Sequence, residues 1–439
     1  MMTLFSTHLI ILYVEECIQL MIQSAYMFCF TKKRIYLDHA SGTACSKKVM
    51  DVMTPYFTEM AFNPGGIYKE SVKVNKVLSG ARNDIAAILK AQAKEIYFMD
   101  GATEANNLAI IGSVKSWKNN NPGEIPHVIT TVIEHAAVLE TTKFLEREGV
   151  FVTYLKVDSY GLISLKELKE SLTENTVVIS IGYVNGEIGT IQDIRSIMKT
   201  IRHYRKNKKQ KNHSDIISSP YPYVHTDAVQ AVNYVEVLGV LKLGVDLMTI
   251  NASKIYGPKK IAALYIKNSI NIEPIIFGGN QEHGLRSGTE NVPYIIGFAK
   301  SLSETRNIFK SEILRLGTLQ KFLHQELINY DSEIIINSSA KYKIPNIINI
   351  SIPNLSHEEI VIRLDAVGFM CSVKSACKVG EDGDSHVIMA LRNNTTGSLR
   401  ISLGRETNKK DLKRFMKSFI EIVDEMKQTY IKFIKKDTL

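Results

Sequence analysis

The sequence predicts an α/β protein with a mainly parallel sheet, because short apolar runs alternate along the chain with amphipathic helical segments. The runs are apolar on both faces, as is typical of strands that helices cover on each side. The segments between them, such as 74–90, carry apolar residues at helical spacing. Active sites of such sheets form beyond the carboxyl ends of the strands. Seven runs fit a strand: IYFM (96–99), HVITTVI (127–133), FVTYLKV (151–157), TVVISIGYV (176–184), YVHTDA (223–228), VDLMTI (245–250) and IAALYI (261–266).

The order of elements changes at about residue 301, which predicts two domains. Beyond this point a helix, a short strand, a loop and a basic amphipathic helix over 408–437 indicate a smaller α+β unit. We therefore expect residues 51–300 to form a large domain, and residues 34–50 with 301–439 to form the small one.

Residues 1–33 are expected to be a poorly ordered extension. They are apolar, but His8, Glu15 and Glu16 interrupt any membrane span, and neither a secretory nor a mitochondrial leader fits. Met27 is a candidate for the true start of the chain.

Charge and cysteine content narrow the class of protein. The net charge of +9 is modest for 439 residues and arises partly from local basic runs, so it does not indicate nucleic-acid binding. The Lys-rich stretch 203–221 is expected to be a surface loop, and it lacks the interleaved aromatics of a nucleic-acid site. The five cysteines form no CxxC pair, which argues against disulfides and zinc and favours a reducing, cytoplasmic compartment.

Asp227 and Lys254 each follow a predicted strand, and a strand, a helix and a strand fit between them. Both side chains are therefore expected at the same edge of the sheet. Taken singly, Asp227 is a helix cap and Lys254 an exposed loop lysine. Together they fit a pyridoxal-phosphate site, where a lysine carries the cofactor as a Schiff base and an acid faces the pyridine nitrogen.

Two further motifs follow predicted strands. GATEANNLAIIG (101–112) opens a helix whose first donors, at Ala102 and Thr103, can receive a phosphate; an ordinary N-cap at Thr103 fits equally well. His135 in VIEHAAVLE can stack on a cofactor ring and exchange protons, although a lone histidine is more often structural.

Ten motifs, taken in order, resemble those of the cysteine desulfurases of the NifS and IscS type. The resemblance covers residues 34 to about 420, and the shared order of the motifs makes chance similarity remote. The motifs are YLDHASGT (36–43), NPGGIY (63–68), GATEANNLAI, EHAAVLE, VNGEIGTIQDI (184–194), HTDAVQA, SKIYGPKK, RSGTENV (286–292), SVKSAC (372–377) and LRISLGR (399–405).

The resemblance implies a fold type I pyridoxal-phosphate homodimer with a mainly parallel, seven-stranded-type sheet. In such an enzyme Lys254 carries the cofactor and Asp227 lies under its pyridine nitrogen. Arg400 would pair with the carboxylate of the L-cysteine substrate, and Asn63 would also lie at the substrate. The other implied cofactor contacts are Ala102, Thr103, the stacking acid/base His135, Asn185, Gln230 near the ring phenolate, Asn251, Ser253 and, from the partner subunit, the residue at Thr289.

The resemblance also makes Cys377 the sulfur acceptor, in a loop (371–386) whose composition is typical of a mobile surface segment. Its thiolate, aided by Lys374, Lys378 or His135, would attack the substrate sulfur. Alanine and a Cys377 persulfide would result, with the sulfur passed to an acceptor protein for iron–sulfur cluster assembly or tRNA thiolation. No metal site is expected beyond transient contact of Cys377 with a cluster, and Cys371 is expected to be buried.

Three positions depart from the family pattern. Gly186 stands where an asparagine usually reaches the cofactor phenolate, and a glycine cannot replace that amide. Asn251 and Ser253 replace a serine and a histidine at the phosphate, but both can still donate hydrogen bonds. Tyr68 stands where a histidine is common.

Two alternatives remain open. Lys254 and Asp227 also suit another fold type I enzyme, an aminotransferase or a selenocysteine lyase, because that pair serves many reactions. The departures from the family pattern favour a non-catalytic scaffold for sulfur relay. Cys377 in its loop distinguishes a desulfurase from a transaminase.

Overall fold

The computed structural model describes residues 34–211, 221–339, 341–373, 385–391 and 397–437. The predictions for residues 1–33, for Cys377 and for the neighbouring Lys374 and Lys378 lie outside these ranges. Within the described ranges, no helix is both long and apolar enough to cross a membrane.

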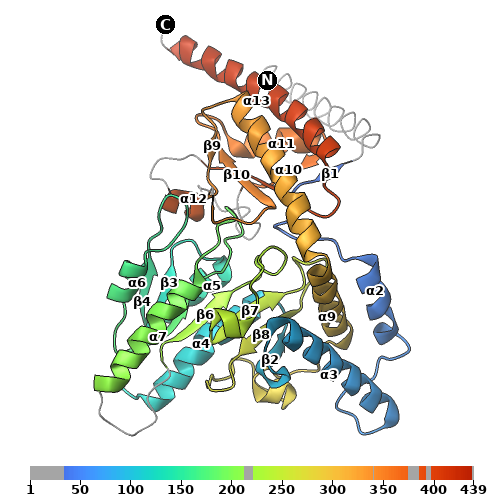
Figure 1. Cartoon of the computed structure of the whole chain (residues 1–439), viewed down its shortest axis with the longest axis vertical. Coiled ribbons are helices and arrows are strands. Elements are labelled where there is room, and N and C mark those ends of the chain that lie inside the picture. The colour runs from blue at the N-terminus through green and yellow to red at the C-terminus, as the bar shows by residue number, and fades with distance from the viewer. Residues whose placement is uncertain (1–33, 212–220, 340, 374–384, 392–396, 438–439) are drawn as a thin grey trace, which may run out of the picture.

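A seven-stranded sheet lies at the centre of the larger part of the molecule (Figure 1). All pairs from β7 to β4 are parallel, while β8 runs antiparallel to both of its neighbours. The mainly parallel sheet is therefore confirmed, and each strand falls within or beside the run predicted for it. In order across the sheet the strands are β2 (Ile96–Met99), β8 (Ala262–Ile266), β7 (Leu247–Asn251), β6 (Tyr223–Asp227), β5 (Thr176–Ser180), β3 (His127–Thr131) and β4 (Phe151–Leu155).

Helices cover both faces of this sheet, which is why its central strands are apolar throughout. Side chains on one face, such as Leu247, pack in one core with α4 (Ala102–Asn120) and α5 (Ala136–Arg147). Their neighbours on the other face, such as Met248, pack in a second core. That core contains α3 (Lys69–Leu89), α7 (Ile194–Lys211) and α9 (Val292–Asn307); shorter helices are α2 (Lys47–Met53), α6 (Leu165–Glu170) and α8 (Val240–Leu243).

The expectation of a surface loop from residue 203 onward is wrong for its first part, because α7 continues to Lys211. Ile194, Ile197 and Ile201 bury one face of this helix, and the Lys, Arg and Gln residues that follow are good helix formers. Arg205 extends the contact by donating to the Pro222 carbonyl and pairing with Asp246. A polar composition alone therefore did not identify a loop.

A second group of elements lies at the top of Figure 1, in orange and red. Here β1 (Ile35–Tyr36) pairs in parallel with β11 (Phe369–Met370), which brings the start of the described chain to its carboxyl-terminal part. A separate antiparallel sheet has the order β12 (Leu399–Ser402), β10 (Ile347–Ser351) and β9 (Ile335–Ile336). The helices are α10 (Phe309–Tyr330), α11 (His357–Ala366), α12 (His386–Leu391) and α13 (Lys409–Asp437), the last being the predicted basic helix.

Candidate active site

A cavity of about 510 Å³ opens beyond the carboxyl ends of the parallel strands. Such a volume is typical of small-molecule sites. Asn63 and Thr289 are exposed and do not line it, and Cys377 lies outside the described residues. The cavity brings together ten of the predicted site residues: Ala102, Thr103, His135, Asn185, Asp227, Gln230, Asn251, Ser253, Lys254 and Arg400.

Lys254 follows β7 and is half-buried in the cavity wall. Its amine donates a hydrogen bond to the Ser41 carbonyl, and its own carbonyl accepts one from the Asn233 amide. These contacts fix both the backbone and the amine of the lysine, so the nitrogen is directed at the rim shared with β6.

Asp227 is the last residue of β6, and two donors hold its carboxylate in place. Oδ1 accepts from the Val229 backbone N–H at 3.0 Å, and Oδ2 accepts from the Asn106 amide at 2.7 Å. Asn106 is fully buried on α4. The carboxylate is thereby held at the cavity, at the same edge of the sheet as Lys254.

His135 is the N-cap of α5, and its Nδ1 accepts from the Ala137 backbone N–H at 3.1 Å. An accepting Nδ1 carries no proton, so this bond places the proton of the neutral ring on Nε2. The ring is therefore held by the start of its own helix while it lines the cavity.

Groups suited to a phosphate gather at the start of α4. Gly101 has φ +113°, which allows the sharp turn from β2 into the helix. The first N–H groups of the helix, at Ala102 and Thr103, have no intrahelical acceptor and face this end of the cavity. Across from them the Asn251 amide donates to Ser253 Oγ at 3.0 Å, while Asn251 Oδ1 is buried without a partner among the described residues.

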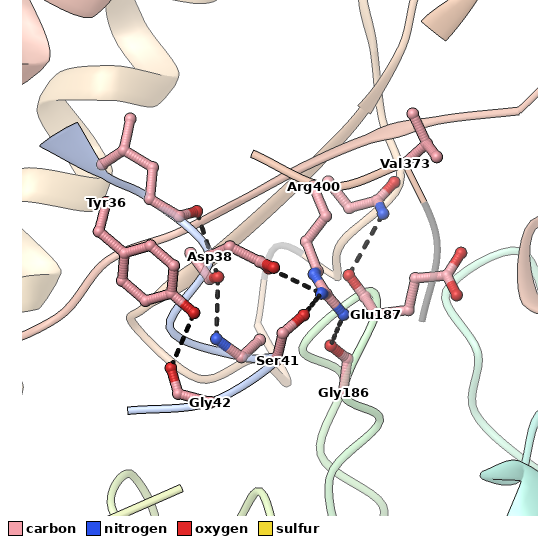
Figure 2. A network of polar contacts seen from close by, with 12 residues as sticks. Tyr36, Asp38, Ser41, Gly42, Gly186, Glu187, Val373 and Arg400 are labelled. Atoms are coloured by element: carbon pink, nitrogen blue, oxygen red, sulfur yellow. Dashed lines mark hydrogen bonds and ion pairs between the residues drawn. The ribbon is translucent and has the colours of Figure 1, made fainter. Parts of the chain in front are cut away.

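Arg400 lies in the wall of the cavity, on β12, with a side chain only 3% exposed. Figure 2 shows its guanidinium in contact with Asp38, Ser41 and Gly186. Arg400 Nη2 donates to Asp38 Oδ1 at 2.8 Å and to Ser41 Oγ at 2.6 Å. Its Nη1 donates to the Gly186 carbonyl at 3.0 Å. Nε has no partner among the described residues. The guanidinium is thus fixed and charge-compensated in the wall of the cavity.

Gly186 changes the wall beside Gln230. A Cβ at this position would lie 3.1 Å from Gln230 Nε2 and 3.2 Å from its Cγ. The glycine leaves room for the Gln230 side chain. The side-chain amide of Gln230 donates a hydrogen bond to the Ala40 carbonyl at 2.8 Å. Asn185 is held in its own turn, because Oδ1 accepts from the Glu187 and Ile188 backbone.

These residues fit pyridoxal phosphate. The cavity offers a primary amine, a fixed carboxylate, an imidazole and, at the phosphate end, an unsatisfied helix N-terminus and the Ser253 hydroxyl. When bound, this cofactor supplies an electron sink for reactions at the carbon next to an amine. Lys254 would hold it covalently, Asp227 would face its ring nitrogen, and Ala102, Thr103 and Ser253 would bind its phosphate.

Several residues that line the cavity or hold its side chains in place were missed from the sequence. Asp38 and Asn106 lie inside quoted motifs, but their use as partners of Arg400 and Asp227 depends on elements distant in the chain. Glu134 and His386 also line the cavity, and only the short motif around His135 could have drawn attention to Glu134.

Cys371 packs against the main core as expected, although the residue keeps some exposure. Burial raises the pKa of its thiol, so it forms a thiolate poorly. Among the described residues no group of His, Cys, Asp and Glu side chains is arranged to hold a metal ion.

Fold, cavity and motifs together define a pyridoxal-phosphate enzyme of the aminotransferase type. The chain belongs to the class-V aminotransferase family, which matches residues 35–415. A curated relative is the cysteine desulfurase IscS of Dictyoglomus turgidum, 37% identical over 399 residues that make up 90% of this chain and 96% of the relative. The resemblance inferred from the motifs is thereby confirmed.

Solved structures agree with this assignment. A NifS-like protein from Rickettsia africae matches with a TM-score of 0.76 and 26% identity, over 89% of this chain and 99% of the other. A protein described as SspA in complex with cysteine matches with a TM-score of 0.70 and 32% identity, over 84% of this chain and 98% of the other. The predicted fold class is confirmed.

Proposed function

We propose that this protein is a cysteine desulfurase that uses pyridoxal phosphate to convert L-cysteine to L-alanine. The observation that carries the proposal is the convergence of Lys254, Asp227 and Arg400 on one cavity. A lysine and a carboxylate suit the cofactor, and a buried arginine in the cavity wall suits the carboxylate of an amino acid.

The residues divide the work as follows. Arg400 binds the substrate carboxylate and so fixes the amino acid in the cavity. Lys254 would hold the cofactor and, as a free amine, would take the α-proton of the substrate. Asp227 would face the ring nitrogen of the cofactor, and His135 would exchange protons through Nε2.

Sulfur transfer needs a nucleophile, for which we propose Cys377. Its sulfur forms an S–S bond to the substrate sulfur while the substrate C–S bond breaks, and the carbon gains a proton. The products are alanine and a persulfide on Cys377. No external oxidant or reductant is required, because the two electrons of the broken C–S bond stay on carbon.

The persulfide sulfur is passed to an acceptor protein, for iron–sulfur cluster assembly, tRNA thiolation or both, in the cytoplasm. We further propose a homodimer. Ile67 and Tyr68, adjacent residues that precede α3, are 99% and 50% exposed. A second subunit would cover such side chains and would supply the residue at Thr289 to the phosphate.

The decisive experiment incubates the full-length enzyme with L-cysteine and measures alanine together with the mass of the peptide that contains Cys377. Wild type should release alanine and gain one sulfur on that peptide. Cys377→Ala should lose both signals and keep the bound cofactor, whereas the control Cys371→Ala should retain both.

Lys254→Ala tests the cofactor's attachment. It should abolish covalent attachment and lower turnover by about a thousandfold or more. Alanine release by Cys377→Ala at the wild-type rate would contradict the proposal, as would a Lys254→Ala protein that still holds the cofactor covalently.

A further inference from the structure

Glu134, which immediately precedes His135, carries a buried carboxyl group at the base of the cavity. Its Oε1 accepts from the Thr131 hydroxyl at 2.7 Å, and its Oε2 accepts from the Gly182 backbone N–H at 2.9 Å. A Cβ at position 182 would lie 3.0 Å from Oε2, so a larger residue there would crowd the carboxyl. The side chain is thus fixed between the ends of β3 and β5.

The backbone of Glu134 is fixed from the other side of the cavity. Its carbonyl accepts a hydrogen bond from His386 Nε2 at 3.0 Å. His386 is the first residue of α12, so one residue connects the sheet edge to this helix. Any change in the position or charge of Glu134 is therefore transmitted directly to His135, its neighbour in the chain.

The negative charge of an ionised Glu134 carboxyl is not balanced by an ion pair among the described residues. Among the described residues no Lys or Arg forms an ion pair with Glu134, and its two hydrogen bonds come from neutral donors. Burial, with a smaller contribution from the Asp227 carboxylate, raises the pKa of Glu134 to about 7, although Thr131, Gly182 and His135 act in the opposite direction. The other titratable groups that line this cavity include His386 on α12, Glu187 on the turn after β5, Lys254 after β7 and Arg400 on β12.

We propose that Glu134 is a positioning residue that binds and releases a proton, and that through its charge it sets the protonation of the groups around the cofactor ring. Ionised Glu134 places a second negative charge beside Asp227 and next to His135. That charge favours the protonated forms of His135 and of the cofactor. The effect on catalysis rests on the proposed function, whereas the protonation of Glu134 does not depend on it.

The first test follows the carboxyl group without turnover. Difference infrared spectra of the full-length holoenzyme should show the band of a protonated carboxyl disappearing as pH rises through about 7. Glu134→Gln should lack this change. The control Glu140→Gln, on the exposed face of α5, should keep it. The same band change in Glu134→Gln as in wild type would overturn the proposal.

The second test follows the visible absorbance of the bound cofactor against pH. Glu134→Gln should lower the midpoint of its spectral transition by about one pH unit, because a nearby charge is removed. Glu140→Gln should leave the midpoint unchanged. An unchanged midpoint in Glu134→Gln would count against the proposal even if the enzyme remained an active desulfurase.

Thr131→Val should shift the pH of the transition in the opposite direction. It also provides a second test in case the Glu134→Gln protein folds poorly. Valine is similar in shape to threonine but cannot donate to Oε1, so it removes a bond that favours ionised Glu134. The infrared transition should move above its wild-type pH. A downward shift or no shift would contradict the assignment. Because none of these spectra needs cysteine, their failure is separate from loss of desulfurase activity.

Discussion

His225 lies in the layer of buried polar side chains beneath the cavity. It is fully buried on β6, where Nδ1 contacts Ser180 Oγ at 2.9 Å and Nε2 contacts Thr249 Oγ1 at 3.0 Å. Burial lowers the pKa of His225 to about 4, and the Asp227 charge opposes this only in part. The folded protein therefore keeps this imidazole neutral at a pH where an exposed histidine is charged.

Acid should consequently destabilise the protein through His225. The unfolded chain binds a proton at this residue below about pH 6.5, whereas the folded chain does so only near pH 4. The contribution of neutral His225 to the free energy of unfolding is fully present above pH 6.5. It is lost as pH falls through the range between the two pKa values, by about 3 kcal/mol in total. Urea unfolding should show this loss in wild type relative to His225→Asn, measured at several pH values.

Glu134 makes the opposite contribution, since its folded pKa is raised and its stabilisation is lost as pH rises toward 7. This contribution cancels when the unfolding free energies of wild type and His225→Asn are subtracted, because both proteins keep Glu134. Parallel pH profiles for the two proteins would contradict a neutral, buried His225.

Single residues were predictable where a motif named them. Lys254, Asp227 and His135 each follow a strand, so strand position and residue type were enough to expect them at one edge. Glu134 was not predictable in its present role, because its burial depends on the Gly182 backbone from another strand.

At the level of elements, close backbone approach limits how α4 can sit on the sheet. A Cβ at Gly112 would lie 2.6 Å from the Glu273 carbonyl oxygen, a backbone atom that cannot turn aside. The Glu273 N–H in turn donates to the Gly112 carbonyl at 3.0 Å. The glycine therefore determines the distance between α4 and the segment that follows β8.

Gly112→Ala should thus lower the free energy of unfolding by about 1–3 kcal/mol, because the added methyl forces the two backbones apart. The matched control is Gly80→Ala in α3, where a Cβ meets nothing within 4 Å. That change should be neutral or stabilising by up to about 1 kcal/mol, because alanine favours helix. Chemical denaturation of the two variants beside wild type measures both effects, and equal effects would refute the explanation.

Elements themselves were predicted best where hydrophobic periodicity was strong, as in the strands of the sheet and in α13. The end of α7 was predicted wrongly, because its last turns contain few apolar residues. Arg205 holds this part through Pro222 and Asp246, which are contacts that no local pattern reveals.

Across the whole molecule, one continuous core joins the two groups of elements. It includes Val74 of α3, Ile181 beyond β5, Ile347 of β10 and Leu399 of β12. The turn after β5 is also tied to the second group, since the Ile188 carbonyl accepts from Ser338 Oγ at 2.7 Å. The second group of elements thus shares its core with the larger one, which also has a further core under α4 and α5.

The described part of the chain should therefore unfold cooperatively. We expect scanning calorimetry of the full-length protein to give one endotherm, with equal calorimetric and van't Hoff enthalpies. Two resolved transitions would show that the orange and red elements of Figure 1 melt independently, contrary to the shared core. The scan is to be repeated with cofactor, whose binding to the folded state should raise the midpoint.

The sequence by itself determined the order of strands and helices, the α/β class and the positions of Lys254, Asp227 and His135 at strand ends. These follow from local periodicity and from the geometry of parallel sheets, which depend on residues close together in the chain. Only the tertiary structure decided that Asp38 pairs with Arg400, that Asn106 holds Asp227 and that Glu134 is buried against the Gly182 backbone. Those contacts join residues from separate elements, and burial among them sets each group's charge.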